Sequence, residues 1–225
     1  MPSDTESDQH LEGQDGHEER QDRGESGPKK KAAELAASIV AGTADPGIVH
    51  YARTLESDNA SAASQAARIL DEVVALKPEV VAPHIERLVR MLSSENPRVV
   101  QTCANALPVL ARVAPAKVAR HLERLRSGYD AASDVAKDGM VRTFVALCTA
   151  SVAYQKRVID VLEKALSGAE PKTLLRWTEV VLPALKGEPH AQARAVVEQR
   201  VPELPRPQAE KIADFLGIRL RPSRV

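Results

Sequence analysis

An internal repeat of 37 residues is the feature of this chain that most constrains its fold. At that offset, residues 59–89 fall into register with residues 96–126, and the stretch 84–88 (HIERL) matches 121–125 (HLERL). A period of this length is typical of stacked helical units, each of which buries its apolar face against its neighbours. The sequence therefore predicts an all-α chain built as a linear array, whose functional part is a binding surface.

Each repeat is expected to contain two helices. Pro78 suits the first position of a helix, where no amide hydrogen is needed. The apolar residues that follow it recur at spacings of four, three and four and form one stripe: Val81, Ile85, Leu88 and Leu92. Pro83 and Pro108 fall inside predicted helices, and we expect each of them to bend its helix.

The second helix of each repeat begins at a residue that suits the N-cap. Asn59, Asn96 and Ser133 stand one period apart, and each can accept an amide hydrogen from the first turn. The apolar stripe of the third such helix is expected to comprise Val135, Met140, Phe144 and Leu147. Further helices are expected over 30–41, 152–166, 171–185, 191–201 and 208–216.

The formal charge of the chain is zero, but the charges are unevenly distributed. Residues 1–27 contain nine acidic residues and two arginines, so they carry −7 and leave +7 on the remainder. We expect residues 1–28 to form a disordered acidic arm, 29–217 the helical array, and 218–225 a basic tail. The arm is interpreted either as a solubilising tail or as a mimic of an anionic ligand that regulates access to the array.

Several classes of function lack support in the sequence. Cys103 and Cys148 lie in apolar helical stretches without disulfide-framework spacing, which indicates buried, reduced thiols and a cytoplasmic protein. No signal peptide is expected, and no window approaches the about 18 apolar residues of a membrane span. There is no glycine-rich phosphate loop, and the repeat-equivalent His84 and His121 lack metal-ligand spacing. We therefore predict no metal, cofactor or small-molecule substrate.

Residues 96–107 (NPRVVQTCANAL) resemble the second helix of a HEAT repeat, which typically shows an Asp or Asn cap, then Val-Arg, small residues and Ala-Leu. This resemblance covers most of 30–216. It implies a right-handed α-α superhelix of about four to five HEAT-like helix pairs, with the second helices on the concave side. The arginine that usually follows the valine is replaced by Ala63, Val100 and Lys137, so a regular ladder of arginine and carboxylate between repeats is not expected.

HEAT proteins of bacteria include adaptors, enzyme regulators, lyase-like proteins and a DNA glycosylase group. Our first hypothesis is a non-catalytic, cytoplasmic protein-binding module that acts as an adaptor or as a regulator or inhibitor of a partner enzyme. A segment of the partner would lie along the second helices. The side chains expected to hold it lie opposite the apolar stripe: Arg98, Gln101, Asn105, Lys137 and Arg142.

The alternative is a nucleic-acid-binding protein with a basic concave surface and a glycosylase-like groove. The arginines that would contribute are Arg87, Arg90, Arg98, Arg120, Arg124, Arg126 and Arg142. A carboxylate base could be Asp138 or Glu179, and an extruded base would have to stack on an aromatic side chain. The aromatic residues nearest in sequence are Phe144, Tyr154 and Trp177.

Overall fold

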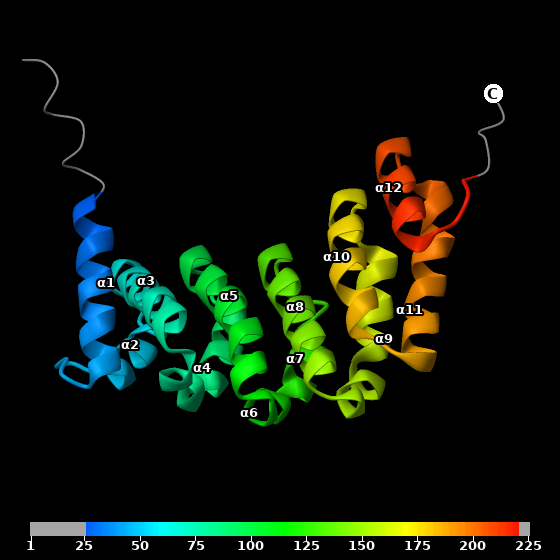
Figure 1. Cartoon of the computed structure of the whole chain (residues 1–225). Coiled ribbons are helices and arrows are strands. Elements are labelled where there is room, and N and C mark those ends of the chain that lie inside the picture. The colour runs from blue at the N-terminus through cyan, green and yellow to red at the C-terminus, as the bar shows by residue number, and fades with distance from the viewer. Residues whose placement is uncertain (1–25, 221–225) are drawn as a thin grey trace, which may run out of the picture.

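The computed structural model describes residues 26–220, and all regular structure within that range is helical (Figure 1). Its α-helices are α1 (Ser26–Ala41), α2 (Ile48–Thr54), α3 (Ala60–Leu76), α4 (Ile85–Arg90), α5 (Pro97–Val113), α6 (Pro115–Ala119), α7 (Leu122–Gly128), α8 (Asp134–Ala150), α9 (Val152–Gly168), α10 (Pro171–Ala184), α11 (Gly187–Arg200) and α12 (Arg206–Leu216). Four short 3-10 helices complete it: η1 (Pro78–Val80), η2 (Ala82–His84), η3 (Met91–Ser93) and η4 (Val201–Glu203). The expectation of an all-α fold is confirmed for this range.

Residues 1–25 of the predicted disordered arm (1–28) lie outside the described residues, as do residues 221–225 of the predicted basic tail, whereas residues 26–28 belong to α1. The first helix begins at Ser26, a few residues before its expected start. It ends before Gly42, whose φ of 74° is the left-handed conformation that favours glycine at a helix end. No helix among residues 26–220 has both the length and the apolar composition needed to cross a bilayer.

The helices stand in one curved row from α1 at one end to α11 and α12 at the other (Figure 1). The long helices α3, α5, α8 and α10 lie side by side along this row, and each packs against the next. The shorter helices α2, α4, α6 and α7 lie beside and below them in the view of Figure 1. Helices that are neighbours along the sequence are therefore also neighbours in space.

The long helices begin where the repeat places a capping side chain. The side chain of Asn59 accepts a hydrogen bond from the amide of Ala62 at 3.0 Å, and that of Ser133 accepts one from Ala136 at 3.4 Å. Asn96 accepts from the amide of Arg98 at 3.0 Å. All three predicted N-caps are thus confirmed, and each satisfies an amide that the helix itself leaves unpaired.

The expected helix that starts at Pro78 is not continuous, which corrects the prediction of one bent helix. It is divided into η1, η2, α4 and η3, and Pro83 lies in η2. Proline has no amide hydrogen to donate and its ring crowds the preceding turn. The next unit breaks at the equivalent point, between α6 and α7, although Arg120 stands there instead of proline. The interruption therefore belongs to the repeat and not to Pro83 alone.

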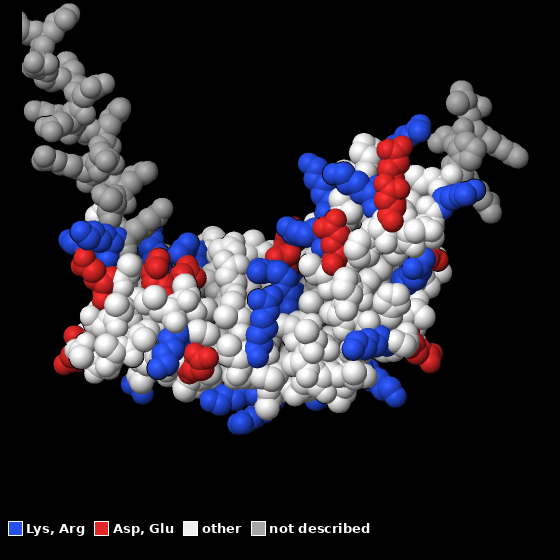
Figure 2. Space-filling model, in the orientation of Figure 1, with Lys and Arg blue, Asp and Glu red and all other residues white. Residues whose placement is uncertain are grey.

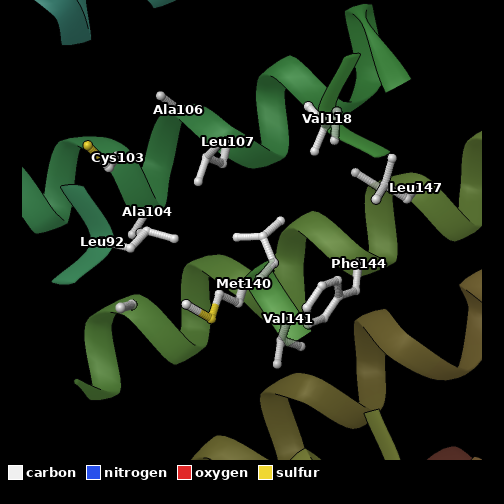
Figure 3. Packing of buried hydrophobic residues seen from close by; sticks show 14 of the residues in the cluster. Leu92, Cys103, Ala104, Ala106, Leu107, Val118, Met140, Val141, Phe144 and Leu147 are labelled. Atoms are coloured by element: carbon white, nitrogen blue, oxygen red, sulfur yellow. The ribbon is translucent and has the colours of Figure 1, made fainter. Parts of the chain in front are cut away.

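One continuous apolar core runs through the row, and Figure 3 shows the part of it where α5 packs against α8. Met140, Phe144 and Leu147 are buried there, as predicted. Val135 is not, because 40% of its surface is exposed; the stripe of α8 begins instead with Ala136. The prediction for Val135 is wrong because it stands five residues before Met140, a spacing that puts the two on different sides of a helix, whereas Ala136 stands four residues before Met140.

Candidate functional site

The residues expected to bind a partner lie on α5 and α8, in the middle of the row of long helices (Figure 1). The structure divides them into two groups. Arg98 and Gln101 lie in the first two turns of α5, and Arg98 reaches α3. Asn105 and Arg142 form a second group where α8 meets α5, and Lys137 lies one to two turns before Arg142.

Arg98 is held by an acidic residue that the sequence analysis did not single out. Its guanidinium forms an ion pair with Asp71 of α3, and the two side chains are 41% and 29% exposed. Partial burial raises the pKa of Asp71, although the charge of Arg98 opposes that shift. Gln101 is half-buried on the same helix and makes no side-chain hydrogen bond with another described residue.

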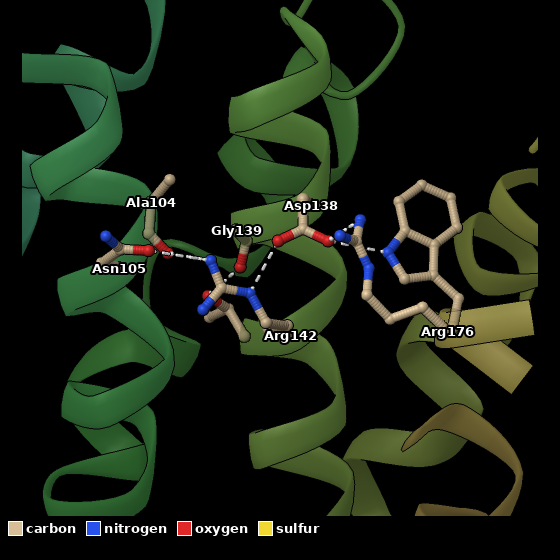
Figure 4. Close-up of polar contacts among 8 residues, drawn as sticks. Ala104, Asn105, Asp138, Gly139, Arg142 and Arg176 are labelled. Carbon is tan, nitrogen blue, oxygen red and sulfur yellow. Dashed lines mark hydrogen bonds and ion pairs between the residues drawn. The ribbon is translucent and has the colours of Figure 1, made fainter. Parts of the chain in front are cut away.

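Asn105 and Arg142 are brought into direct contact (Figure 4). The Nη2 of Arg142 donates to Oδ1 of Asn105 at 3.1 Å and to the backbone carbonyl of Ala104 at 3.3 Å. Both acceptors belong to α5, so this arginine joins two neighbouring long helices. Its Nε donates to Asp138, one turn earlier on α8, at 2.9 Å.

Asp138 extends this network to α10 (Figure 4). Its Oδ1 accepts from Nη2 of Arg176 at 2.8 Å and from the indole nitrogen of Trp177 at 3.0 Å. The carboxylate is therefore shared by two arginines and one indole from two helices. We call Asn105, Asp138, Arg142, Arg176 and Trp177 the Asp138 network.

Arg176 is the member of this network that sequence reasoning missed. A signal was present, because Arg176 follows Asp138 by 38 residues, close to one repeat, and so falls on the neighbouring long helix. The structure also refines the expectation that no regular ladder of arginine and carboxylate joins the repeats. Arginine–carboxylate pairs do connect successive long helices, as Arg98–Asp71 and Arg176–Asp138, but at positions that are not equivalent in the repeat.

Lys137 has a different environment from the other expected residues. Its Nζ lies 5.9 Å from the ring centroid of Tyr129, a cation–π distance. It also lines a hollow between α8, α9 and α10 together with Lys164 and Arg176, and three acidic residues line the same hollow: Asp130, Asp134 and Glu170. Figure 2 shows basic side chains over the middle of this face, with acidic side chains close to them.

A close helix crossing holds the network in place. A Cβ added to Gly139 would lie 2.5 Å from Cβ and 2.6 Å from Cα of Ala104. Glycine is required here so that α8 can approach α5, and this approach brings Arg142 to the carbonyl of Ala104 (Figure 4). The guanidinium of Arg142 is thereby fixed between two packed helices instead of moving freely in solvent.

The geometry is unfavourable for a base-extruding enzyme. Trp177 is 5% exposed with its indole engaged by Asp138, and Phe144 is fully buried. Tyr154 is only half-buried, but it lies on α9, whereas Asp138 lies on α8. Of the two proposed carboxylate bases, Asp138 is occupied by two arginines and Glu179 is exposed without a pairing residue among those described. No described aromatic face near Asp138 is open for a base to stack on.

Most of the arginines that suggested nucleic-acid binding are ion-paired. Arg87 and Arg90 both bind Glu56, at 2.5 and 2.7 Å, and Arg126 binds Asp160 at 2.5 Å. Arg120 and Arg124 are exposed and form no ion pair with a described residue. These pairs lower the positive potential that a phosphate backbone would meet on this surface.

The histidines and cysteines offer no reactive site in the described part of the chain. No group of three or more His, Cys, Asp or Glu residues in range 26–220 is placed to hold a metal ion. Burial and the nearby Arg87 lower the pKa of His84, which therefore stays neutral at physiological pH. Cys103 and Cys148 are buried free thiols, as predicted, and burial raises the pKa of Cys148 to about 12.

Comparison with known proteins adds information on the fold alone. No protein-family model matches the chain, and no curated protein matches its sequence. One solved structure that resembles it is a crystal structure described as an engineered protein, with a TM-score of 0.60 and 17% identity. The alignment covers 84% of this chain and 88% of that one. The chain thus shares its helical arrangement with a known structure.

Proposed function

We propose that the chain is a HEAT-like right-handed α-α superhelix of about four to five helix pairs whose second helices line the concave side. The resemblance of residues 96–107 to a HEAT second helix supports this proposal. Further support comes from the equivalent N-caps at Asn59, Asn96 and Ser133 and from the row formed by α3, α5, α8 and α10. On this proposal the Asp138 network lies on the concave side.

We further propose that this surface binds a protein partner without catalysis, and that the chain serves as a cytoplasmic adaptor or as a regulator or inhibitor of a partner enzyme. The observation that carries the proposal is the shared carboxylate of Asp138. A guanidinium has five N–H donors, and Asp138 takes one each from Arg142 and Arg176. Arg176 remains 61% exposed and Arg142 37%, so both have donors left for a ligand.

These donors favour an acidic peptide segment as the ligand. Arg142, Arg176 and the neighbouring Lys137 supply three positive charges around the carboxylate of Asp138, while Asp130, Asp134 and Glu170 line the hollow beside Lys137 and Arg176. Planar guanidinium groups bind carboxylates in a bidentate manner, and here they are pre-positioned by contacts with two other helices. A bound segment would block the face along α5, α8 and α10, which is how such a module could inhibit an enzyme.

The test begins with affinity purification of the tagged protein from its native source, with nuclease treatment and moderate salt, and identification of co-purifying proteins. A stoichiometric protein that survives both treatments is expected. Binding of that protein is then measured for Arg176→Glu, which we expect to weaken affinity at least tenfold, about 1.4 kcal/mol. The matched control is the single variant Arg157→Glu on α9, which makes the same charge change at a side chain that is exposed and carries no ion pair with a described residue.

Two results would overturn the proposal. Unchanged affinity of Arg176→Glu, with its helical circular-dichroism signal intact, would show that the Asp138 network is not the interface. Co-purification of nucleic-acid-associated proteins that disappear with nuclease, and affinity that falls steeply as salt rises, would instead favour the nucleic-acid-binding alternative.

A further inference from the structure

A second basic site lies at the other end of the row, between α1 and α3. The hollow there measures about 530 Å³ and is lined by the basic residues Lys31 and Arg68, the small or polar residues Gly27, Ser61, Ser64 and Gln65, and the apolar residues Ala32, Leu35 and Ile69. Its walls contain no acidic side chain. Lys31 and Arg68 are exposed, and neither forms an ion pair with another residue of the described range.

The repeat explains why these two cations face each other. Lys31, Arg68, Asn105 and Arg142 are equivalent positions, each 37 residues from the next. Just as Arg142 on α8 reaches Asn105 on α5, Arg68 on α3 faces Lys31 on α1 across the hollow. Because Lys31 and Arg68 are both positively charged, they repel each other unless an anion lies between them.

Among the described residues, the hollow between α1 and α3 has no counterpart of Asp138, the carboxylate that neutralises the charge of Arg142. Asp138, which binds Arg142, stands four residues before it; the residues four before Lys31 and Arg68 are Gly27 and Ser64. Both of these line the hollow, so the space that a carboxylate would occupy is open. The nearest acidic residue on α3, Asp71, is engaged by Arg98, and Glu34 and Glu72 form no ion pair with either cation.

We propose that the acidic segment 15–25 of this same chain supplies the missing carboxylates and binds in the hollow between α1 and α3. The segment joins α1 at the rim of the hollow, because Gly27 is one of its lining residues. It contains Asp15, Glu18, Glu19, Asp22 and Glu25. Asp22 is five residues from Gly27, and five extended residues span up to about 17 Å, which exceeds the about 10 Å that separates packed helices.

Covalent attachment makes this occupant favourable. Two carboxylates within a few residues of the hollow have a high effective concentration there, whereas a separate ligand loses translational freedom on binding. The segment would cover the exposed side of the first helix pair, which has no preceding unit to pack on within the described residues. This site is distinct from the Asp138 network, so the proposal does not depend on the function proposed above.

The test is paramagnetic relaxation enhancement on the full chain. A nitroxide is attached to Gly16→Cys in ¹⁵N-labelled protein; the native thiols of Cys103 and Cys148 are buried and are not labelled. At low salt we expect the amide signals of 61–69 to lose more than half of their intensity. The double variant Lys31→Glu/Arg68→Glu should abolish most of this loss, and the equal charge change in Lys156→Glu/Arg157→Glu should not.

The proposal is overturned if no signal is lost over 61–69, if the same loss is seen in Lys31→Glu/Arg68→Glu, or if the loss is centred on 134–142 and 171–178. A mixture of nitroxide-bearing ¹⁴N protein and nitroxide-free ¹⁵N protein shows whether the segment binds another copy of the chain instead of its own. A loss of signal over 61–69 in that mixture would also overturn the proposal. Well-dispersed spectra show that each variant is folded, and Lys31→Gln/Arg68→Gln provides the milder change if charge reversal prevents folding.

Discussion

Gly139 sets the distance between α8 and α5, because any side chain there would meet the backbone of Ala104. We expect Gly139→Ala to lower the free energy of unfolding by about 1–3 kcal/mol, since the helices must separate to admit the methyl group. The change should also loosen the contact of Arg142 with Ala104. Urea denaturation followed by circular dichroism measures the effect.

Gly168→Ala is the matched control for that experiment. Gly168 also lies in a helix, but a Cβ added there has nothing within 4 Å. Alanine has the higher helix propensity, so this variant should be neutral or stabilised by up to about 1 kcal/mol. If both variants behaved alike, the close approach of α8 to α5 would not be a determinant of stability.

The two thiols should be unreactive in the native protein. Burial raises the pKa of Cys148 to about 12, and it also raises that of Cys103. At pH 8 neither is a thiolate, which is the reactive species. Ellman's reagent should therefore titrate no thiol quickly in the folded chain and two thiols in guanidinium chloride. Rapid reaction of one thiol in the native state would contradict the packing described here.

The same shifts give the stability a defined pH dependence. Folded Cys148 and Tyr129 retain their protons up to pKa values of about 12, whereas their unfolded counterparts lose them near pH 9 and 10. The unfolded state then binds fewer protons, so the free energy of unfolding should fall as pH rises from about 9 to 12. Urea titrations at a series of pH values measure this, and a rise over that range would contradict it.

Sequence patterns predicted individual residues well where the repeat itself fixed the role. The spacing of Asn59, Asn96 and Ser133 was sufficient because an N-cap depends on local geometry. Asp138 and Arg176 were not assembled into a site, because their contact depends on the distance between α8 and α10. Val135 was misplaced because it stands five residues before Met140, whereas the buried Ala136 stands four residues before it.

At the scale of elements, Asn96 is more than a local cap. Its Nδ2 donates to the carbonyl of Ala60 at 3.1 Å and to the hydroxyl of Ser64 at 3.0 Å, so it ties the start of α5 to the start of α3. Asn59 caps α3 by bonding to the amide of Ala62. The two residues occupy equivalent places in the repeat, but within the described range only Asn96 also forms side-chain hydrogen bonds to a neighbouring long helix.

We therefore expect Asn59→Ala to cost about 1 kcal/mol of stability and Asn96→Ala to cost more, about 2 kcal/mol, because the latter also removes hydrogen bonds between helices. Asn96→Ser keeps a capping oxygen but loses the hydrogen bonds to α3, so it should cost less stability than Asn96→Ala. Denaturation midpoints of the three variants test this order. Equal losses for the two alanine variants would show that the bonds to Ala60 and Ser64 add nothing.

The segment 78–93 shows the limit of periodicity as a guide to elements. Its apolar stripe is buried as predicted at Val81, Ile85, Leu88 and Leu92. The backbone that carries these residues is nevertheless interrupted three times. Spacings of three and four residues do not distinguish an α-helix from linked α and 3-10 turns, because both place such residues on one side.

At the scale of the whole molecule, the row predicts graded stability. The helices α5 and α8 have packed neighbours on both sides, whereas α1 and α12 lie at the ends. In such an array each unit is stabilised by its neighbours, and the ends open more often than the middle. Hydrogen exchange should therefore be slowest in α5 and α8 and fastest in α1 and α12. Uniform protection along the chain would indicate a single cooperative unit instead.

The all-α architecture could be predicted from the sequence because a repeat constrains every unit at once. The identity of a ligand could not, because exposed positions of a repeat tolerate many side chains and their charges depend on neighbours in adjacent units. Arg98 and Arg142 illustrate this point. Both were predicted to be available to a partner, and each is bound to a carboxylate within the chain.

Trp177 is the single tryptophan of the sequence, and it lies in the Asp138 network. Its fluorescence therefore comes from one place, the junction of α8 and α10. A ligand that draws Arg176 away from Asp138 alters the field around the indole and should shift or quench its emission. The native chain thus carries its own optical reporter of occupancy, and a titration needs no label.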